Sequence, residues 1–175
     1  MNLFTELHQQ LIKELLDGGV EFIIIGGYSV IFHGYERTTG DIDIWLKPYN
    51  GNKTKLIVAL EQLGLKQEYL REISRIDFSK HFAFNIGKEP EKIDFITRIN
   101  LVEYEEADKM KIVADMDGIM IPFLHLNHLI LSKINTGRLK DQADIKSYRK
   151  FSVQKVKNDN YHFLIVHERI TFAQT

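Results

Sequence analysis

The feature that most limits how this chain can fold is a double glycine between two apolar runs, in FIIIGGYSVIFHGYERTTGDIDIWL, residues 22–46. The first run, residues 22–25, is apolar and mostly β-branched without polar alternation, which predicts a strand covered on both faces. The strand ends at Gly26 and Gly27, and residues 28–34 are predicted to form a short helix.

The second apolar run, residues 41–46, alternates apolar side chains with Asp41 and Asp43. This pattern predicts a strand with two acids on one face, about 7 Å apart. Both carboxylates ionise readily only with a cation between them, and oxygen ligands at this spacing suit Mg²⁺ or Mn²⁺. Asp94, set between apolar residues in KIDFI, is a candidate third ligand. Since such ions complete their shell with phosphate oxygens, we expect a phosphate ester as substrate.

The double glycine suggests where phosphates would bind. A strand that ends at Gly26 and Gly27 and opens a helix leaves backbone N–H groups exposed, which favours anions. The hydroxyl of Ser29 is expected to add a further donor.

The rest of the chain predicts an α/β (α+β) fold, with a mixed, mainly antiparallel sheet of about five strands and helices packed on it. We expect the active cleft at the edge that carries the acids. The predicted domain spans residues 1–150, and the remaining residues are expected to form a strand or tail. Helices are predicted at residues 2–17, 52–63, 127–134 and, after a break at 135–137, 138–151. Hairpins are predicted at 81–86 with 92–97 and at 110–114 with 119–123.

Composition limits the class of protein. With 175 residues, 44% hydrophobic, the chain is long enough for one well-buried core. A formal net charge of -1 supplies no bulk positive field for non-specific nucleic-acid binding, and the absence of cysteine excludes disulfides and thiol catalysis. There is neither a membrane-spanning apolar run nor a signal-peptide pattern, so we expect a cytoplasmic protein with no membrane partner.

Together, IIIGGYS, GDIDIW and KIDFI resemble the polymerase-β-like nucleotidyltransferases, which place Gly-Gly or Gly-Ser after a strand, Asp-x-Asp on the next strand and a third acid later. Within that superfamily, the sequence is similar to a small bacterial group that includes the abortive-infection type toxin nucleotidyltransferases. That group carries HG-x-x-R-x-T-x-D-I-D and K...R-x-K-D-x-x-D. The matching residues here are His33, Gly34, Arg37, Thr39, Asp41, Ile42, Asp43, Lys133, Arg138, Lys140, Asp141 and Asp144.

The resemblance spans residues 21–148 and implies transfer of a nucleoside monophosphate from a nucleoside triphosphate to an RNA, protein or small-molecule acceptor. It implies that Asp41, Asp43 and Asp94 hold the metal and carry catalysis. Gly26, Gly27 and Ser29 would cradle the β- and γ-phosphates. The expected cationic contacts to the triphosphate are Lys133, Arg37 and Arg138. A toxin-type role, with an antitoxin or homo-oligomer partner, also follows from the resemblance.

Plainer interpretations of the same residues stay open at this point. Asp43 could form a structural ion pair with Arg37, and Asp94 could be neutralised by Lys92 or Arg98. The charged residues from 133 to 144 could form a solvated, ion-paired helical hairpin. His33 is expected to be structural. An alternative function is a catalytically silent regulator of the same fold that binds nucleotide or a partner.

Overall fold

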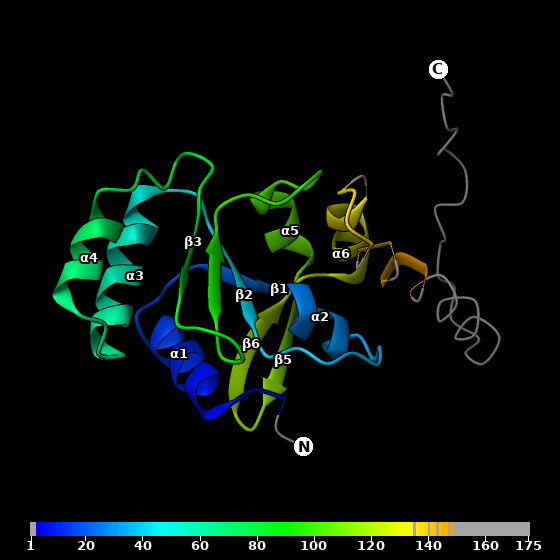
Figure 1. The fold of residues 1–175 in the computed structure, drawn as a ribbon, viewed down its shortest axis with the longest axis horizontal. Coiled ribbons are helices and arrows are strands. Elements are labelled where there is room, and N and C mark those ends of the chain that lie inside the picture. The colour runs from blue at the N-terminus through cyan, green and yellow to red at the C-terminus, as the bar shows by residue number, and fades with distance from the viewer. Residues whose placement is uncertain (1–2, 135, 140, 143, 147, 149–175) are drawn as a thin grey trace.

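A six-stranded mixed sheet forms the centre of the computed structural model, which describes residues 3–134, 136–139, 141–142, 144–146 and 148 (Figure 1). The strands are β1 (Phe22–Ile25), β2 (Ile42–Leu46), β3 (Ala83–Ile86), β4 (Ile93–Ile96), β5 (Ile112–Met116) and β6 (Ile119–Phe123). Their order across the sheet is β3-β4-β2-β1-β6-β5. The pairs β1–β2, β3–β4 and β5–β6 are antiparallel, while β1–β6 and β2–β4 are parallel. The expected mixed, mainly antiparallel sheet is therefore confirmed, with six strands instead of about five.

The labelled helices are α1 (Glu6–Asp17), α2 (Gly26–Phe32), α3 (Asn50–Gln62), α4 (Gln67–Ser74), α5 (Tyr104–Met110) and α6 (Leu126–Lys133). The described residues 139, 141–142, 144–146 and 148 are helical too. The sequence did not predict α4 or α5. They have only eight and seven residues, and each buries two side chains, too few to show a helical repeat. Because α5 includes Met110, β5 begins two residues later than expected.

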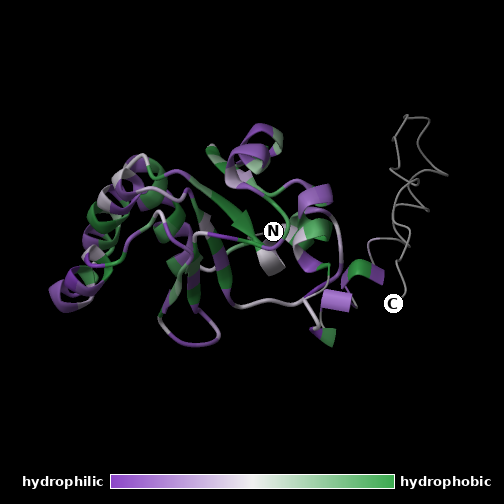
Figure 2. Ribbon diagram, turned by 90° about the horizontal axis from the view of Figure 1, so that it is seen from above, coloured by the Kyte–Doolittle hydropathy of each residue, from purple (hydrophilic) through white to green (hydrophobic). Residues whose placement is uncertain are grey.

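One face of the sheet is covered by α1, α3 and α4 (Figure 1). The apolar residues of β2 (Ile42, Ile44 and Leu46) point to this face and are fully buried. Helix α1 starts where the Thr5 hydroxyl accepts a hydrogen bond from the His8 backbone N–H at 3.3 Å. In Figure 2, hydrophobic stretches run along the strands, while hydrophilic residues are frequent on the surrounding helices.

The other face of the sheet packs against α5 and α6. There the Trp45 ring meets Tyr104 of α5 edge-on, with ring centroids 5.1 Å apart, and Leu129 of α6 joins the same apolar cluster. Asp43 lies on this face too, two residues before Trp45 on β2. The predicted alternation along β2 is thus confirmed, and it turns the acids away from the main core.

In the part of the chain that the structure describes, none of the helices has the length and apolar composition needed to cross a membrane. Residues 151–175 lie outside the described residues, so the expected strand or tail there stays a prediction.

Candidate active site

Three polar side chains form a row across neighbouring strands. Asp43 of β2 is directly opposite Asp94 of the parallel strand β4, and Asp94 is opposite Asn85 of the edge strand β3. Directly paired residues on neighbouring strands point to the same face of the sheet, with strands about 4.8 Å apart. Asn85 was not among the predicted site residues, because the expected hairpin of residues 81–86 with 92–97 places Phe84 opposite Asp94, one residue out of the observed register.

A cleft of about 480 Å³ opens over this row. Asp43, Asp94 and Gly26 line it from the sheet side, and Lys133 and Arg138 line it from the α6 side. Five of the nine predicted site residues therefore meet in one cleft. Polar lining residues that the sequence did not single out are Asn85, Asn100, Ser132 and Thr136, and the cleft is also lined by Arg98, which had been considered only as a partner of Asp94.

The carboxylate of Asp43 is under electrostatic strain inside the cleft. Burial raises its pKa, and the neighbouring Asp94 carboxylate raises it further; a hydrogen bond from the Gly27 backbone N–H and the charge of Arg37 offset only part of this. A hard cation between Asp43 and Asp94 would relieve this strain, so the residues present fit Mg²⁺ or Mn²⁺. Within the described ranges, however, no group of three Asp, Glu or His side chains is placed to hold a metal ion.

Asp41 lies just before β2 and does not line the cleft. It is connected to the acidic row through Lys92, whose Nζ is 2.9 Å from Asp94 Oδ2 and 3.9 Å from Asp41 Oδ2. The hydrogen bond to Asp94 raises the pKa of Lys92, which therefore stays charged. Of the two candidates for neutralising Asp94, Lys92 makes the contact, whereas Arg98 pairs with Glu103 at 3.6 Å.

The double glycine provides space for the acidic segment. Gly26 has a φ of +62°, and a Cβ built there would come within 1.8 Å of Asp43 Oδ2. A Cβ on Gly27 would come within 2.5 Å of Thr39 Oγ1. The absence of both side chains lets Thr39 and Asp43 approach the turn between β1 and α2.

Replacing Gly26 with Ala should therefore displace Asp43 as well as strain the backbone. Gly19→Ala is a matched control, because Gly19 has a φ of +63° and open space around its missing Cβ. Both variants should lose about 1–2 kcal/mol of stability from the left-handed backbone. Only Gly26→Ala should also lose activity, by about 100-fold, as expected for a shifted catalytic group. Urea unfolding and a nucleotidyl-transfer assay measure both effects, and equal activities in the two variants would contradict the role given to Gly26.

Ser29 is fully buried, and its Oγ donates a hydrogen bond to the Leu124 carbonyl at 3.3 Å. Its hydroxyl is thus turned away from the cleft, which does not fit the expected contact with phosphate. His33 Nε2 lies 2.8 Å from the same carbonyl, in agreement with the expected structural role. Both residues fasten α2 to the segment that follows β6.

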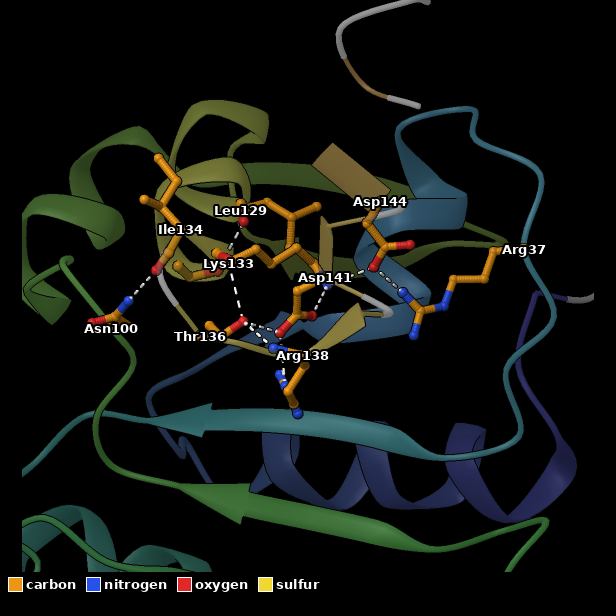
Figure 3. Close-up of polar contacts among 10 residues, drawn as sticks. Arg37, Asn100, Leu129, Lys133, Ile134, Thr136, Arg138, Asp141 and Asp144 are labelled. Carbon is orange, nitrogen blue, oxygen red and sulfur yellow. Dashed lines mark hydrogen bonds and ion pairs between the residues drawn. The ribbon is translucent and has the colours of Figure 1, made fainter. Parts of the chain in front are cut away.

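The α6 side of the cleft is held by a buried ion network (Figure 3). Lys133 Nζ lies 3.0 Å from Asp141 Oδ1 and 2.7 Å from Asp144 Oδ2. Arg37 Nη1 donates to Asp144 Oδ2 at 2.5 Å, and Arg138 Nε donates to Asp141 Oδ2 at 2.7 Å. The ion pairing considered above for these residues is therefore present, but it is not solvated throughout: the Lys133 and Asp141 side chains are only 8% and 3% exposed, whereas Arg138 is 74% exposed.

The network also shows which acid Arg37 neutralises. Arg37 forms its ion pair with Asp144, not with Asp43. Burial alone would raise the pKa of Asp141, but hydrogen bonds from Thr136, Lys133 and Arg138 outweigh it and lower that pKa. Lys140, the remaining charged residue of this motif, lies outside the described residues.

A crystal structure of a candidate nucleotidyltransferase from Thermotoga maritima has a similar fold, with a TM-score of 0.52 and 15% sequence identity. The match covers 87% of this chain and 89% of that one. No curated protein matches the sequence. A family model described as "nucleotidyltransferase of unknown function" (DUF6036) matches residues 1–158. The chain therefore belongs to this nucleotidyltransferase family.

Proposed function

We propose that this protein is a Mg²⁺- or Mn²⁺-dependent enzyme that transfers a nucleoside monophosphate from a nucleoside triphosphate to an acceptor. The observation that carries the proposal is the pairing of Asp43 with Asp94 on adjacent parallel strands, inside a cleft whose opposite side carries Lys133 and Arg138. Acids on one side and cations on the other suit a metal–triphosphate complex.

Asp43 and Asp94 would hold the metal ion. Asp41, which lies outside the cleft and is connected to Asp94 through Lys92, would become a third ligand when the ion binds. When bound, the ion would stabilise the negative charge that develops around the α-phosphate. The acceptor oxygen would form its bond to the α-phosphorus while pyrophosphate leaves. Asp94 would accept the proton of the acceptor hydroxyl, since it lies on the side of the row that faces the edge strand.

The cations of the α6 side have different roles in this proposal. The Arg138 side chain is 74% exposed and binds Asp141 through Nε, which leaves the outer end of its guanidinium for a phosphate group. Lys133 is buried between Asp141 and Asp144, and Arg37 is held by Asp144, so we assign both as positioning residues. Gly26 and Gly27 would contribute by seating Asp43, and the backbone of Gly26 lines the cleft beside the expected phosphates.

The acceptor side would begin at Asn85. This residue is exposed, lines the cleft and belongs to an edge strand, so an approaching molecule meets it before Asp94. We propose RNA as the acceptor and a toxin-type role, with a small molecule as the alternative acceptor. Growth arrest on expression, lost in Asp43→Asn and relieved by an antitoxin partner, would support the toxin role; unaffected growth would contradict it.

Calorimetric titration of each nucleoside triphosphate with Mg²⁺ tests the proposed site. Wild type should bind one of them only with metal, and Asp43→Asn/Asp94→Asn should not bind it. Pyrophosphate release with candidate acceptors then measures turnover. Equal binding to wild type and the double variant would remove the metal site from the proposal.

A second candidate function, a silent regulator that binds nucleotide, is favoured by one specific observation. The Lys92 ammonium already bridges Asp41 and Asp94, a geometry that can neutralise the acids without metal. For this function, triphosphate binding should persist in EDTA, and pyrophosphate should not be released.

A further inference from the structure

Lys92 occupies an unusual position beside the acidic row. It immediately precedes β4, and its backbone carbonyl accepts a hydrogen bond from the Ile42 N–H at 2.9 Å, so its main chain is fixed between β2 and β4. Its ammonium contacts Asp94 at 2.9 Å and Asp41 at 3.9 Å. One side chain thus supplies positive charge to two of the three carboxylates assigned to the metal.

We infer that Lys92 is a displaceable internal cation, whose ammonium holds Asp41 and Asp94 in the metal-free protein and leaves them when a divalent ion binds. This inference rests on the proposed function, because it concerns the same acidic site. It makes Lys92 a positioning residue of the metal site and an intrinsic competitor of the metal.

The physical reason is that two cations close to the same carboxylates repel each other. An ammonium within hydrogen-bond distance of Asp94 Oδ2 occupies one of the lone pairs open to a metal ion, and its charge repels a divalent ion at the same place. A lysine side chain can be displaced easily, because its compact ammonium group is carried on a flexible four-carbon stem. The Lys92 side chain is 28% exposed, which leaves it a direct route to solvent.

The other cations near the cleft do not offer this exchange. Lys133 is 8% exposed and contacts two carboxylates of its own network, so moving it would leave Asp141 and Asp144 uncompensated. Arg98 and Arg138 line the cleft but pair with Glu103 and Asp141, and within the described residues neither forms an ion pair with the acidic row. Lys92 is therefore the cation that a metal ion would have to replace.

Titration with Mn²⁺, followed by the electron paramagnetic resonance signal of the free ion, tests the inference without nucleotide. Lys92→Met removes the charge and keeps the apolar stem. It should bind Mn²⁺ at least about tenfold more tightly than wild type, because the internal competitor is gone. Lys80→Met is the matched control, because it changes net charge equally. The Lys80 ammonium lies 4.0 Å from Asp77, and its backbone carbonyl accepts a hydrogen bond from Thr97, at the end of β4 opposite Lys92. The Mn²⁺ affinity of Lys80→Met should equal that of wild type.

Thermal unfolding gives an independent readout. Without metal, Lys92→Met should unfold at a lower temperature than wild type, since Asp41 and Asp94 lose their shared cation, and Mn²⁺ should stabilise it more than wild type. If Lys92→Met fails to fold, Lys92→Gln replaces it in both measurements.

The outcomes separate the inference from the proposed function. If wild type binds Mn²⁺ and the Lys92 variant binds it equally or more weakly, the inference is overturned and the metal site stands. If wild type binds Mn²⁺ no better than Asp43→Asn/Asp94→Asn does, both are overturned. Tighter binding that Lys80→Met reproduces would reveal a general charge effect and also overturn the inference.

Discussion

Asp43→Asn should lose at least about 10³-fold in nucleotidyl transfer and still form a more stable metal-free protein than wild type. The loss is expected because a metal ligand is worth several kcal/mol in the transition state, at about 1.36 kcal/mol per tenfold in rate. The gain in stability is expected because Asn removes a carboxylate that burial and Asp94 hold at a raised pKa. The Asn amide can still occupy the space over Gly26.

The pH dependence gives this prediction a definite sign. A raised folded-state pKa means that the contribution of Asp43 to stability is fully present below its unfolded pKa of about 3.9 and is lost as pH rises through the folded pKa. Without metal, the stabilities of wild type and Asp43→Asn should therefore diverge as pH rises above about 4. Mg²⁺ should raise the unfolding midpoint of wild type more than that of the variant.

Urea unfolding at several pH values, with and without Mg²⁺, measures this effect alongside a transfer assay. Asp17→Asn is the control, since Asp17 forms an exposed pair with Lys13, both side chains being 61% exposed. It should change neither activity nor the pH profile. If Asp43→Asn kept its activity or lost stability at pH 7, Asp43 would be a structural acid and not a metal ligand.

Lys133→Met should lower the free energy of unfolding by about 3–5 kcal/mol, the usual cost of removing one partner from a buried ion pair. Methionine can fill the space of the lysine stem. The loss of stability therefore comes from the uncompensated charges of Asp141, 3% exposed, and Asp144, 14% exposed. Because the pKa of Asp141 is lowered, its contribution is present above about pH 3.9 and lost as pH falls through the folded pKa. The penalty should therefore shrink in acid.

Lys13→Met provides the comparison, because its ion pair with Asp17 is exposed and should be worth at most about 1 kcal/mol. Lys133→Met/Asp141→Asn should be more stable than Lys133→Met alone, since it removes one of the stranded charges. Chemical denaturation at pH 7 measures all three variants. A cost below about 1 kcal/mol for Lys133→Met would show that the network is no more than a surface ion pair.

Local patterns were enough to predict much of this fold. The all-apolar run of β1, the alternation along β2 and the turn residues of the two hairpins each have one dominant physical cause, and the structure contains all of these elements. Asp117 and Gly118 have positive φ values, as a tight hairpin turn requires. The short helices α4 and α5 were not predicted, because two buried side chains are too few to show a helical periodicity.

Long-range contacts account for what the sequence did not show. The parallel pairing of β2 with β4 joins residues about fifty positions apart, and no local pattern indicates it. Likewise, Ser29 looked like a phosphate donor until the structure placed the Leu124 carbonyl, 95 positions away, against its hydroxyl. Arg37 shows the same limit, because its partner Asp144 comes from a segment 107 positions away.

The row formed by Asn85, Asp94 and Asp43 also limits which substitutions and insertions this site can accept during evolution. Its spacing comes from the distance between hydrogen-bonded strands, about 4.8 Å in any sheet, and not from the side chains around it. Core substitutions that keep the ladder would leave the carboxylate separation unchanged. Residues could be added to the exposed part of the turn at 87–89 without moving the ladder, but one residue inserted between Ile93 and Asp94 would send Asp94 to the opposite face. The backbone thus sets the carboxylate spacing, which leaves the side chains of the exposed edge strand free to vary; in the proposed function, these are the side chains that would meet the acceptor.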